Sequence, residues 1–272
     1  MYSDAERFLL DFHQRQPGVT AHAFGGLPVS LRGQQLASSY AVLVQSLPAG
    51  VALTVLDVGC GKGHLLGLLA QAHPASRLVG VDFSLAELRA AAPPVRAWVA
   101  AARAQALPLR DASVDAALSH MALMLMNDAR QVVQDIARVL VPRGVLAAVV
   151  GGPRAPSPAF DTYLTILRRH LAALPVPAPR LGDGSFFKED VLRELLAPHF
   201  TGISIDPITM EERLTPEAAW AGYERMYDIH HLAPGARDAI RQEYLSAVRT
   251  HVEADGLLAI PQQLRCVQAR RR

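Results

Sequence analysis

Apolar residues follow two periods along this chain. Short apolar runs typical of buried strands lie at about residues 53–58, 77–81, 95–100, 114–119 and 144–150. The segments between these runs place apolar residues three and four positions apart, which predicts helices. Because strands that alternate with helices need crossover connections, they form a parallel sheet. The first half of the chain is therefore predicted to be a doubly wound α/β fold.

The second half continues this pattern less regularly. It predicts a helix over 187–196 and strands over 201–208 and 263–269. Three segments do not fit the sheet and are expected to cover a substrate: residues 1–47 as an N-terminal helical lid, and helical inserts at about 153–185 and 215–255. Trp220, Tyr223 and Tyr227 in the last insert could line an apolar pocket. Their spacing of three and four is equally typical of the buried stripe of a helix.

The most informative segment is LTVLDVGCGKGHLL, residues 53–66, in which an apolar strand runs into a glycine-rich turn and then a helical pattern. Gly59, Gly61 and Gly63 can adopt backbone angles that other residues avoid, and they let a ligand approach the backbone closely. The first amide groups of the following helix would face that ligand. A nucleotide-like ligand is expected at this turn.

Two common nucleotide motifs do not match the turn. The dinucleotide fingerprint G-x-G-x-x-G would need glycine at His64, and a phosphate-binding loop would need serine or threonine after Lys62, where Gly63 stands. What remains is Asp57-x-Gly59-x-Gly61-x-Gly63, an acid followed by alternating glycines.

A second acid follows at the predicted end of the next strand. Asp82 stands 25 positions after Asp57 and is followed by Phe83 and Ser84. A carboxylate at this place can accept hydrogen bonds from both hydroxyl groups of a ribose, and Phe83 can cover an adenine face. Asp82 could instead cap the next helix, but Ser84 is equally suited to that role. The ribose role is therefore favoured for Asp82.

Residues 104–144, AQALPLRDASVDAALSHMALMLMNDARQVVQDIARVLVPRG, carry the most distinctive blocks. The blocks are Leu-Pro-Leu at 107–109, Ser-Val-Asp at 113–115 and Arg-Val-Leu-Val-Pro-Arg-Gly at 138–144. Together with the glycine turn, these blocks resemble the class I methyltransferases that use S-adenosylmethionine (SAM), in particular the group with ubiquinone- and biotin-pathway enzymes. The resemblance covers roughly the first half of the chain.

The resemblance implies a Rossmann-like α/β fold with a doubly wound sheet of seven strands, the last one antiparallel, in a single domain over residues 1–272 whose SAM-binding half is 48–150. It implies SAM as cofactor and S-adenosylhomocysteine (SAH) as product. The cofactor-binding residues expected from it are Asp57, Gly59, Cys60, Gly61, Gly63, Asp82, Phe83, Ala104, Gln105, Ser119 and His120. Arg103 departs from the family pattern, because many relatives have an aspartate there that accepts from the adenine amino group. Adenine contact then falls to Gln105 or to the backbone.

Histidines are the candidates for a general base, because their pKa lies near neutrality. His120 follows the fourth strand, where relatives place groups between cofactor and acceptor, and His231 lies beside His230 in the 215–255 insert. His120 could instead offer only its backbone to the methionine end of SAM. The His230–His231 pair could equally form a surface helix end, where a cation complements the helix dipole.

Composition narrows the class of protein. The chain has 272 residues, half of them apolar, and a net charge of +2, which does not indicate a nucleic-acid surface. Arg270–Arg272 is expected to be a solvated tail. The two cysteines form no disulfide framework and no metal site, and no apolar run is long enough to span a membrane. A cytoplasmic enzyme without metal, nucleic-acid or membrane partners is expected.

The sequence therefore predicts a SAM-dependent methyltransferase that acts at oxygen or nitrogen of a small, partly apolar molecule, such as a secondary metabolite. One alternative is a carboxyl O-methyltransferase like the malonyl-carrier-protein enzyme, with Arg168 and Arg169 as candidates to grip a carboxylate. Another is a SAM-binding regulatory protein that no longer transfers methyl groups. The sequence leaves the acceptor, the methylated atom and the oligomeric state undetermined.

Overall fold

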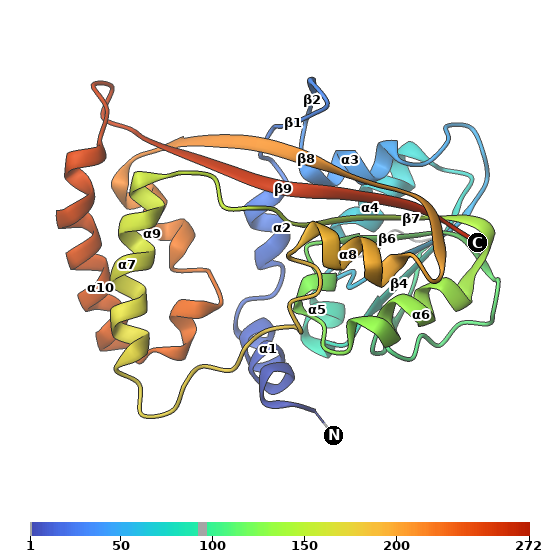
Figure 1. The fold of residues 1–272 in the computed structure, drawn as a ribbon, viewed down its shortest axis with the longest axis horizontal. Coiled ribbons are helices and arrows are strands. Elements are labelled where there is room, and N and C mark those ends of the chain that lie inside the picture. Colours follow the sequence, from blue (N-terminus) through green and yellow to red (C-terminus); the bar gives the residue numbers. More distant parts are fainter. Residues whose placement is uncertain (1, 92–96) are drawn as a thin grey trace. The chain divides into compact units, whose positions relative to one another are not determined.

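The computed structural model describes residues 2–91 and 97–272, which contain a nine-stranded sheet with helices (Figure 1). The strands are β1 (Val29–Leu31), β2 (Gln34–Leu36), β3 (Thr54–Val58), β4 (Arg77–Asp82), β5 (Ala97–Ala101), β6 (Val114–His120), β7 (Leu140–Gly151), β8 (Phe200–Leu214) and β9 (Leu258–Arg271). The α-helices are α1 (Asp4–Arg15), α2 (Val19–Phe24), α3 (Ser39–Gln45), α4 (His64–Ala72), α5 (Leu85–Ala90), α6 (Ala129–Val139), α7 (Pro158–Ala172), α8 (Glu189–Leu196), α9 (Pro216–Tyr223) and α10 (Pro234–Ala247).

The sheet has the order β2-β1-β8-β9-β7-β6-β3-β4-β5. Strands β5, β4, β3, β6 and β7 run parallel, and β9 pairs antiparallel with β7, with Val145 opposite Arg270. The predicted Rossmann-like α/β fold is confirmed, and each predicted strand has a counterpart. Residues 95 and 96 of the strand predicted over 95–100 lie outside the described residues.

The sheet has two strands more than the seven expected. Strands β1 and β2 form a hairpin inside the N-terminal segment, which was predicted to be helical, and β1 neighbours β8. The two turn residues Arg32 and Gly33 have φ of 51° and 81°. Positive φ at both central positions is the geometry of a type I′ turn, which matches the twist of a tight hairpin. An Arg-Gly pair is a weak signal for this turn, which is why the pattern alone did not indicate it.

The chain divides into two compact units. Unit 1 contains Met1–Pro153, Leu181–Ile208 and Leu264–Arg272, and unit 2 contains Arg154–Arg180 and Thr209–Gln263. In unit 1, α6 packs beside α8, α3 beside α4, and α1 beside α5. The apolar stripe of α6, Val132, Val133 and Ile136, is fully buried in the main core. Burial of each such side chain contributes roughly 1.5–3 kcal/mol.

Unit 2 is helical and has an aromatic core. Tyr163 of α7, Trp220 and Tyr223 of α9 and Tyr244 of α10 are buried together, with Tyr163 and Tyr223 stacked at 4.5 Å between ring centroids. Trp220 and Tyr223 therefore form the buried stripe of a helix, whereas Tyr227 lies beyond the end of α9. No helix among the described residues is long and apolar enough to cross a membrane.

The C-terminal arginines are more ordered than a solvated tail. The Arg271 guanidinium donates to the carbonyl oxygens of Leu140 and Arg138, and the Arg272 guanidinium donates to Ala197 O at 3.0 Å. These carbonyls lie at the ends of α6 and α8, where helical carbonyl groups lack partners. Arg270 and Arg272 are exposed, as the prediction of a solvated tail requires, but the segment is ordered because β9 brings Arg271 and Arg272 to these helix ends.

Candidate active site

The glycine turn follows the carboxyl end of β3. Gly59, Gly61 and Gly63 all have positive φ, at 76°, 51° and 84°. A Cβ atom at Gly59 would lie 2.5 Å from the Cβ of Ala122, so the turn has no room for a side chain there. Gly63 is the N-cap of α4 and provides no side-chain cap, so the first amides of this helix remain able to bind a ligand.

Cys60 fills the interior of the same turn. Its side chain is buried and lies where Gly80 of β4 leaves space, because a Cβ at Gly80 would come within 2.8 Å of the sulfur. Burial raises the pKa of the Cys60 thiol above its ordinary range, so the group stays neutral. The Cys60 side chain thus packs the turn, and only its backbone remains for ligand binding.

Asp82 lies at the carboxyl end of β4, directly beside the turn. Its Oδ2 accepts from Gly61 N at 2.9 Å and its Oδ1 accepts from Ser84 N at 2.8 Å. Each carboxylate oxygen retains a further lone pair for a ligand. Ser84 caps α5, as expected, with its hydroxyl accepting from Glu87 N. Burial raises the pKa of Asp82, while the two amide bonds oppose that shift.

Asp57, on β3, is the second acid of the site. It is only 2% exposed, and its Oδ2 has no hydrogen-bond partner among the described residues. Burial, and then the nearby Asp82, raise the pKa of Asp57 to about 8. A buried carboxyl group with an unmet oxygen is typical of a position that a cationic or hydrogen-donating ligand completes.

Ala104 and Gln105 follow β5, and both are held by neighbouring segments. Ala104 is buried, and Gln105 Nε2 donates to Asn127 O at 2.6 Å. Arg103 forms an ion pair with Glu6 of α1, and its guanidinium lies 5.8 Å from the centre of the Tyr2 ring. Arg103, which stands where many relatives have an aspartate, therefore links α1 to this loop.

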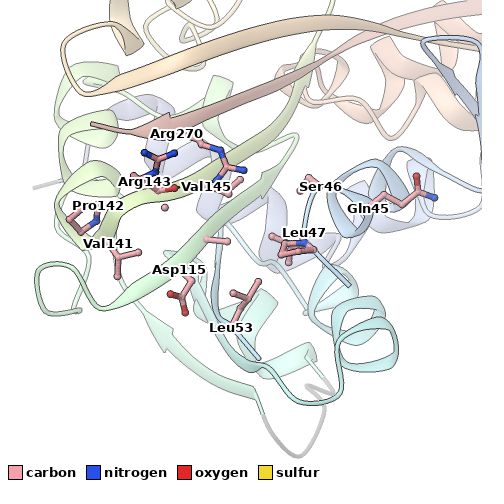
Figure 2. A pocket seen from close by; sticks show the side chains of 13 residues that line it. Gln45, Ser46, Leu47, Leu53, Asp115, Val141, Pro142, Arg143, Val145 and Arg270 are labelled. Atoms are coloured by element: carbon pink, nitrogen blue, oxygen red, sulfur yellow. Dashed lines mark hydrogen bonds between the residues drawn. The ribbon is translucent and has the colours of Figure 1, made fainter. Parts of the chain in front are cut away.

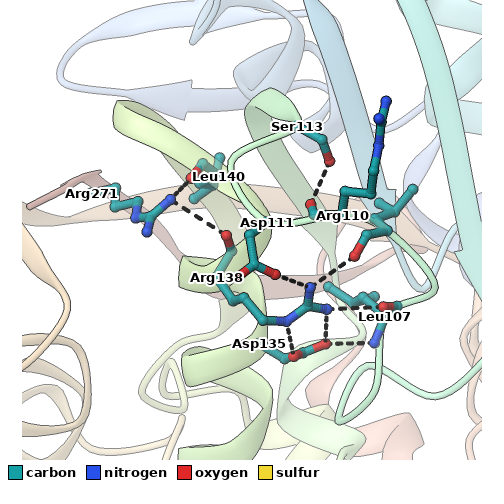
Figure 3. A network of polar contacts seen from close by, with 9 residues as sticks. Leu107, Arg110, Asp111, Ser113, Asp135, Arg138, Leu140 and Arg271 are labelled. Carbon is teal, nitrogen blue, oxygen red and sulfur yellow. Dashed lines mark hydrogen bonds and ion pairs between the residues drawn. The ribbon is translucent and has the colours of Figure 1, made fainter.

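A polar network centred on Arg138 fixes the continuation of that loop (Figure 3). The guanidinium donates to Leu107 O at 3.0 Å and Leu109 O at 2.8 Å, and it pairs with Asp111 and Asp135 at 2.7 Å each. Asp135 also accepts from Leu107 N. The hydrogen bonds to Asp135 and then to Asp111 raise the pKa of Arg138 above its ordinary range, so its charge is permanent. From the sequence, Leu107, Leu109 and Arg138 were recognisable only as parts of family blocks.

Ser119 and His120 end β6 between the glycine turn and the N-terminal segment. The Ser119 hydroxyl donates to Val58 O at 2.7 Å, which ties β6 to the end of β3. His120 Nε2 lies 2.8 Å from Ser39 Oγ, and its Nδ1 has no partner among the described residues. Burial, and then His64, lower the pKa of His120 to about 3. The ring is therefore neutral over the physiological range.

The N-terminal segment, residues 2–47, borders the site closely. The Glu87 carboxylate of α5 is 3% exposed, and it accepts from Gly18 N at 2.9 Å and pairs with His13 Nδ1 at 2.7 Å. A Cβ at Gly18 would lie 2.4 Å from Lys62 Cε. Glu87 and His13 were not singled out from the sequence, because nothing in their spacing indicates that α1 and α5 meet.

Known proteins with similar sequences include methyltransferases. A methyltransferase-domain family matches residues 56–148. The chain is 36% identical over 222 residues, 78% of this chain and 82% of the relative, to the trans-aconitate 2-methyltransferase of Azoarcus sp. (strain BH72). This chain belongs to the class I SAM-dependent methyltransferases.

Other relatives of this methyltransferase match over less of their length. The malonyl-[acyl-carrier protein] O-methyltransferase of Methylovorus sp. (strain MP688) is 33% identical over 130 residues, 42% of this chain and 44% of that protein. The chain thus matches less than half the length of that relative. A solved structure from Anabaena variabilis ATCC 29413, described as a methyltransferase of an antibiotic biosynthesis pathway, has a TM-score of 0.61. It covers 85% of this chain and 95% of that one at 16% identity.

His231 lies in a different part of the methyltransferase. It belongs to unit 2, in the 3-10 helix Asp228–His231, where burial lowers the pKa of its ring. The neighbouring His230 Nε2 lies 2.9 Å from Glu224 O. The catalytic role of His231 remains a prediction. Arg169, proposed from the sequence to grip a carboxylate, pairs with Glu243 of α10.

The methyltransferase also has a hollow of about 480 Å³ at the opposite edge of its sheet (Figure 2). Leu53, Asp115 and Val141 lie in its wall, together with Arg143 and Arg270. These residues precede or begin β3, β6 and β7, or end the antiparallel β9. Because α/β sheets bind ligands at the carboxyl ends of their parallel strands, this hollow is not the candidate active site.

Proposed function

We propose that this methyltransferase binds SAM along the glycine turn and Asp82, and transfers its methyl group to oxygen or nitrogen of a small, partly apolar molecule. The observation that carries the proposal is the arrangement of Asp82. Its carboxylate is fixed by Gly61 N and Ser84 N at the end of β4, directly beside three left-handed glycines. A fixed carboxylate can bind the two hydroxyl groups of a nucleoside, and glycines let the rest of the ligand lie close to the backbone.

The residues present fit such a cofactor. Asp57 Oδ2 is a buried oxygen without a partner in the described chain, and each Asp82 oxygen accepts one backbone amide and keeps a lone pair for a ligand. Asp57 would face the positive charge of the methionine end, and Asp82 the ribose. Phe83, whose ring lies 6.4 Å from that of Tyr2, and Ala104 with Gln105 would border the base.

When bound, SAM supplies an activated methyl group on a positively charged sulfur. The protein then has to aim the acceptor and exclude water, and positioning of this kind can contribute roughly 7–11 kcal/mol. His120, with a pKa near 3, is a weak base. Acceptors that need no deprotonation before attack, such as a carboxylate or a neutral amine, therefore suit the site better than an alcohol.

A carboxyl O-methyltransferase is the second candidate function. Two relatives support it, because trans-aconitate and the malonyl group both carry carboxylates. The Lys62 amine beside Gly18 supplies positive charge next to the glycine turn. Small carboxylates are therefore the first acceptors to test.

The experiment is a calorimetric titration of the purified protein with SAM and with SAH, followed by transfer of labelled methyl from SAM to a panel of carboxylates, amines and phenols. We expect both nucleosides to bind and a carboxylate or amine to be methylated. Failure of folded, cofactor-free protein to bind either nucleoside would overturn the proposal. Binding without transfer to any acceptor class would favour the SAM-binding regulatory protein instead.

A further inference from the structure

A buried hydrogen-bonded pair, Ser39 and His120, lies at the carboxyl end of β6. Ser39 is fully buried and His120 is 5% exposed. Ser39 is the first residue of α3, so its hydroxyl comes from the N-terminal segment, whereas His120 is the last residue of β6. The 2.8 Å contact between Oγ and Nε2 joins two segments that are 81 positions apart.

Aromatic rings hold the His120 ring in place. Tyr40 stacks on it with 3.5 Å between centroids and an interplanar angle of 17°, and Phe24 meets it edge-on at 5.8 Å. His64 of α4 meets the Tyr40 ring edge-on, at 4.6 Å between the ring centroids. With one ring face covered and Nε2 occupied, Nδ1 is the polar atom of His120 that remains for a ligand.

The Ser39 hydroxyl indicates which nitrogen carries the hydrogen. Within the described chain, His120 Nε2 is the hydrogen-bond partner recorded for this hydroxyl. A buried hydroxyl that does not donate loses the hydrogen bond it made to water, at a cost of about 1–3 kcal/mol. If Ser39 donates to Nε2, the neutral ring must carry its hydrogen on Nδ1.

We infer that Ser39 is a positioning residue that holds His120 with its hydrogen on Nδ1, and that this N–H donates a hydrogen bond to a carboxylate oxygen of a ligand in the active site. The inference rests on the proposed function for the identity of the site. It explains why a buried donor at Nδ1 has no partner within the described chain. The carboxylate belongs either to the methyl acceptor or to the methionine end of the cofactor.

The first test reads the tautomer directly and does not depend on cofactor binding. Protein labelled with ¹⁵N-histidine gives distinct ring-nitrogen signals for the two tautomers, and the spectrum of His120→Asn identifies the signals of His120. We expect the hydrogen on Nδ1 in the wild type, and a redistribution toward Nε2 in Ser39→Ala. Ser46→Ala, at the other end of α3 with its hydroxyl on Leu43 O, is the matched control and should leave the spectrum unchanged. A wild-type ring with its hydrogen on Nε2 would overturn the inference.

The second test finds the source of the carboxylate. The Nδ1 proton is followed in three titrations. The first uses SAH, and the second uses 5′-methylthioadenosine, which lacks the carboxylate. In the third, trans-aconitate is added to SAH-loaded protein. A shift with trans-aconitate assigns the contact to the acceptor. A shift with SAH but not with methylthioadenosine assigns it to the cofactor. A proton that no carboxylate perturbs would contradict the inference.

Affinity gives an independent readout. His120→Leu should bind the responsible carboxylate roughly tenfold to a hundredfold more weakly, since a hydrogen bond to a charged group is lost. His120→Asn places an amide donor near Nδ1 and should recover most of that loss. Equal affinities for the wild type and His120→Leu would overturn the role of Nδ1. Absence of SAH binding by the wild type would instead overturn the proposed function, while the tautomer test still decides on Ser39.

Discussion

At the scale of single residues, two carboxyl groups at neighbouring strand ends differ in what holds them. Asp82 has both oxygens bound to backbone amides, whereas Asp57 keeps one oxygen without a partner within the described chain. Hydrogen bonds from amides favour an ionised carboxylate, and burial disfavours it. Asp82 therefore suits the neutral hydroxyl groups of a ligand, whereas Asp57 suits a positively charged group that would favour its ionised form.

Asp82→Ala should weaken SAM binding by about a hundredfold or more, because two hydrogen bonds to a charged group are lost together with the support of Gly61 N. Isothermal titration calorimetry checks this. Asp190→Ala, an exposed acid in the first turn of α8, is the control and should bind SAM like the wild type. Near-wild-type affinity in Asp82→Ala would rule out the assigned ribose site.

SAM binding should release a proton from Asp57. The folded pKa of about 8 lies above the ordinary 3.8, so the carboxyl group is largely protonated below pH 8. Its contribution to stability is complete below about pH 4 and is lost as the pH rises toward 8. A cationic ligand reverses this preference, so SAM affinity should rise with pH between about 4 and 8. Calorimetry in two buffers of different ionisation enthalpy measures the proton release. Asp57→Asn should abolish it, and a wild type without release would contradict the assignment.

At the scale of elements, the junction of α1 and α2 is hydrogen-bonded to α5. Gly18 has a φ of 76°, donates its N–H to the Glu87 carboxylate, and lies against the end of the Lys62 side chain, which would have to move to admit a Cβ. The side chain of His13 reaches the same carboxylate from α1. One buried acid thus fixes two N-terminal helices beside the glycine turn.

Gly18→Ala should destabilise the protein more than Gly33→Ala. Both positions have left-handed backbone, which costs an alanine roughly 1–2 kcal/mol. At Gly18 a Cβ must also displace the end of the Lys62 side chain, whereas a Cβ at Gly33 would meet nothing within 4 Å. Urea unfolding of the two variants measures the difference in the free energy of unfolding. Equal losses of unfolding free energy in the two variants would mean that Lys62 moves aside freely and that packing at Gly18 contributes little.

At the scale of the whole molecule, the residues proposed to bind SAM all belong to unit 1, whereas unit 2 has a core of its own around Tyr163 and Tyr244. Strands β8 and β9 run through both units. A ligand that binds only the folded form of one unit stabilises that unit by mass action.

SAM should therefore protect unit 1 selectively. At a hundred times its dissociation constant, it should stabilise this unit by about 2.7 kcal/mol. Hydrogen exchange followed by mass spectrometry should show slower exchange at the glycine turn and in α1, with peptides of α7 and α10 as the internal control. Protection confined to unit 2 would contradict the proposed cofactor site.

Local signals explain which parts of the site were predictable. The glycines at 59, 61 and 63 and the serine cap at 84 act through their own backbone geometry, so the sequence indicates them directly. Ser39 and Glu87 were not predictable, because each functions through a partner that is 69 to 81 positions away. Arg138 was recognised only as part of a family block, and its network with Asp135 and Asp111 required the fold.

The sequence by itself determined the alternation of strands and helices, the glycine turn, the two acids and the family, because hydrophobic period and backbone preference are local properties of the chain. Only the tertiary structure decided that the N-terminal segment adds a hairpin to the sheet, that Glu87 binds Gly18, and that Ser39 meets His120. Contacts of this kind depend on which distant surfaces pack together. Hydrophobic burial sets that packing for the molecule as a whole.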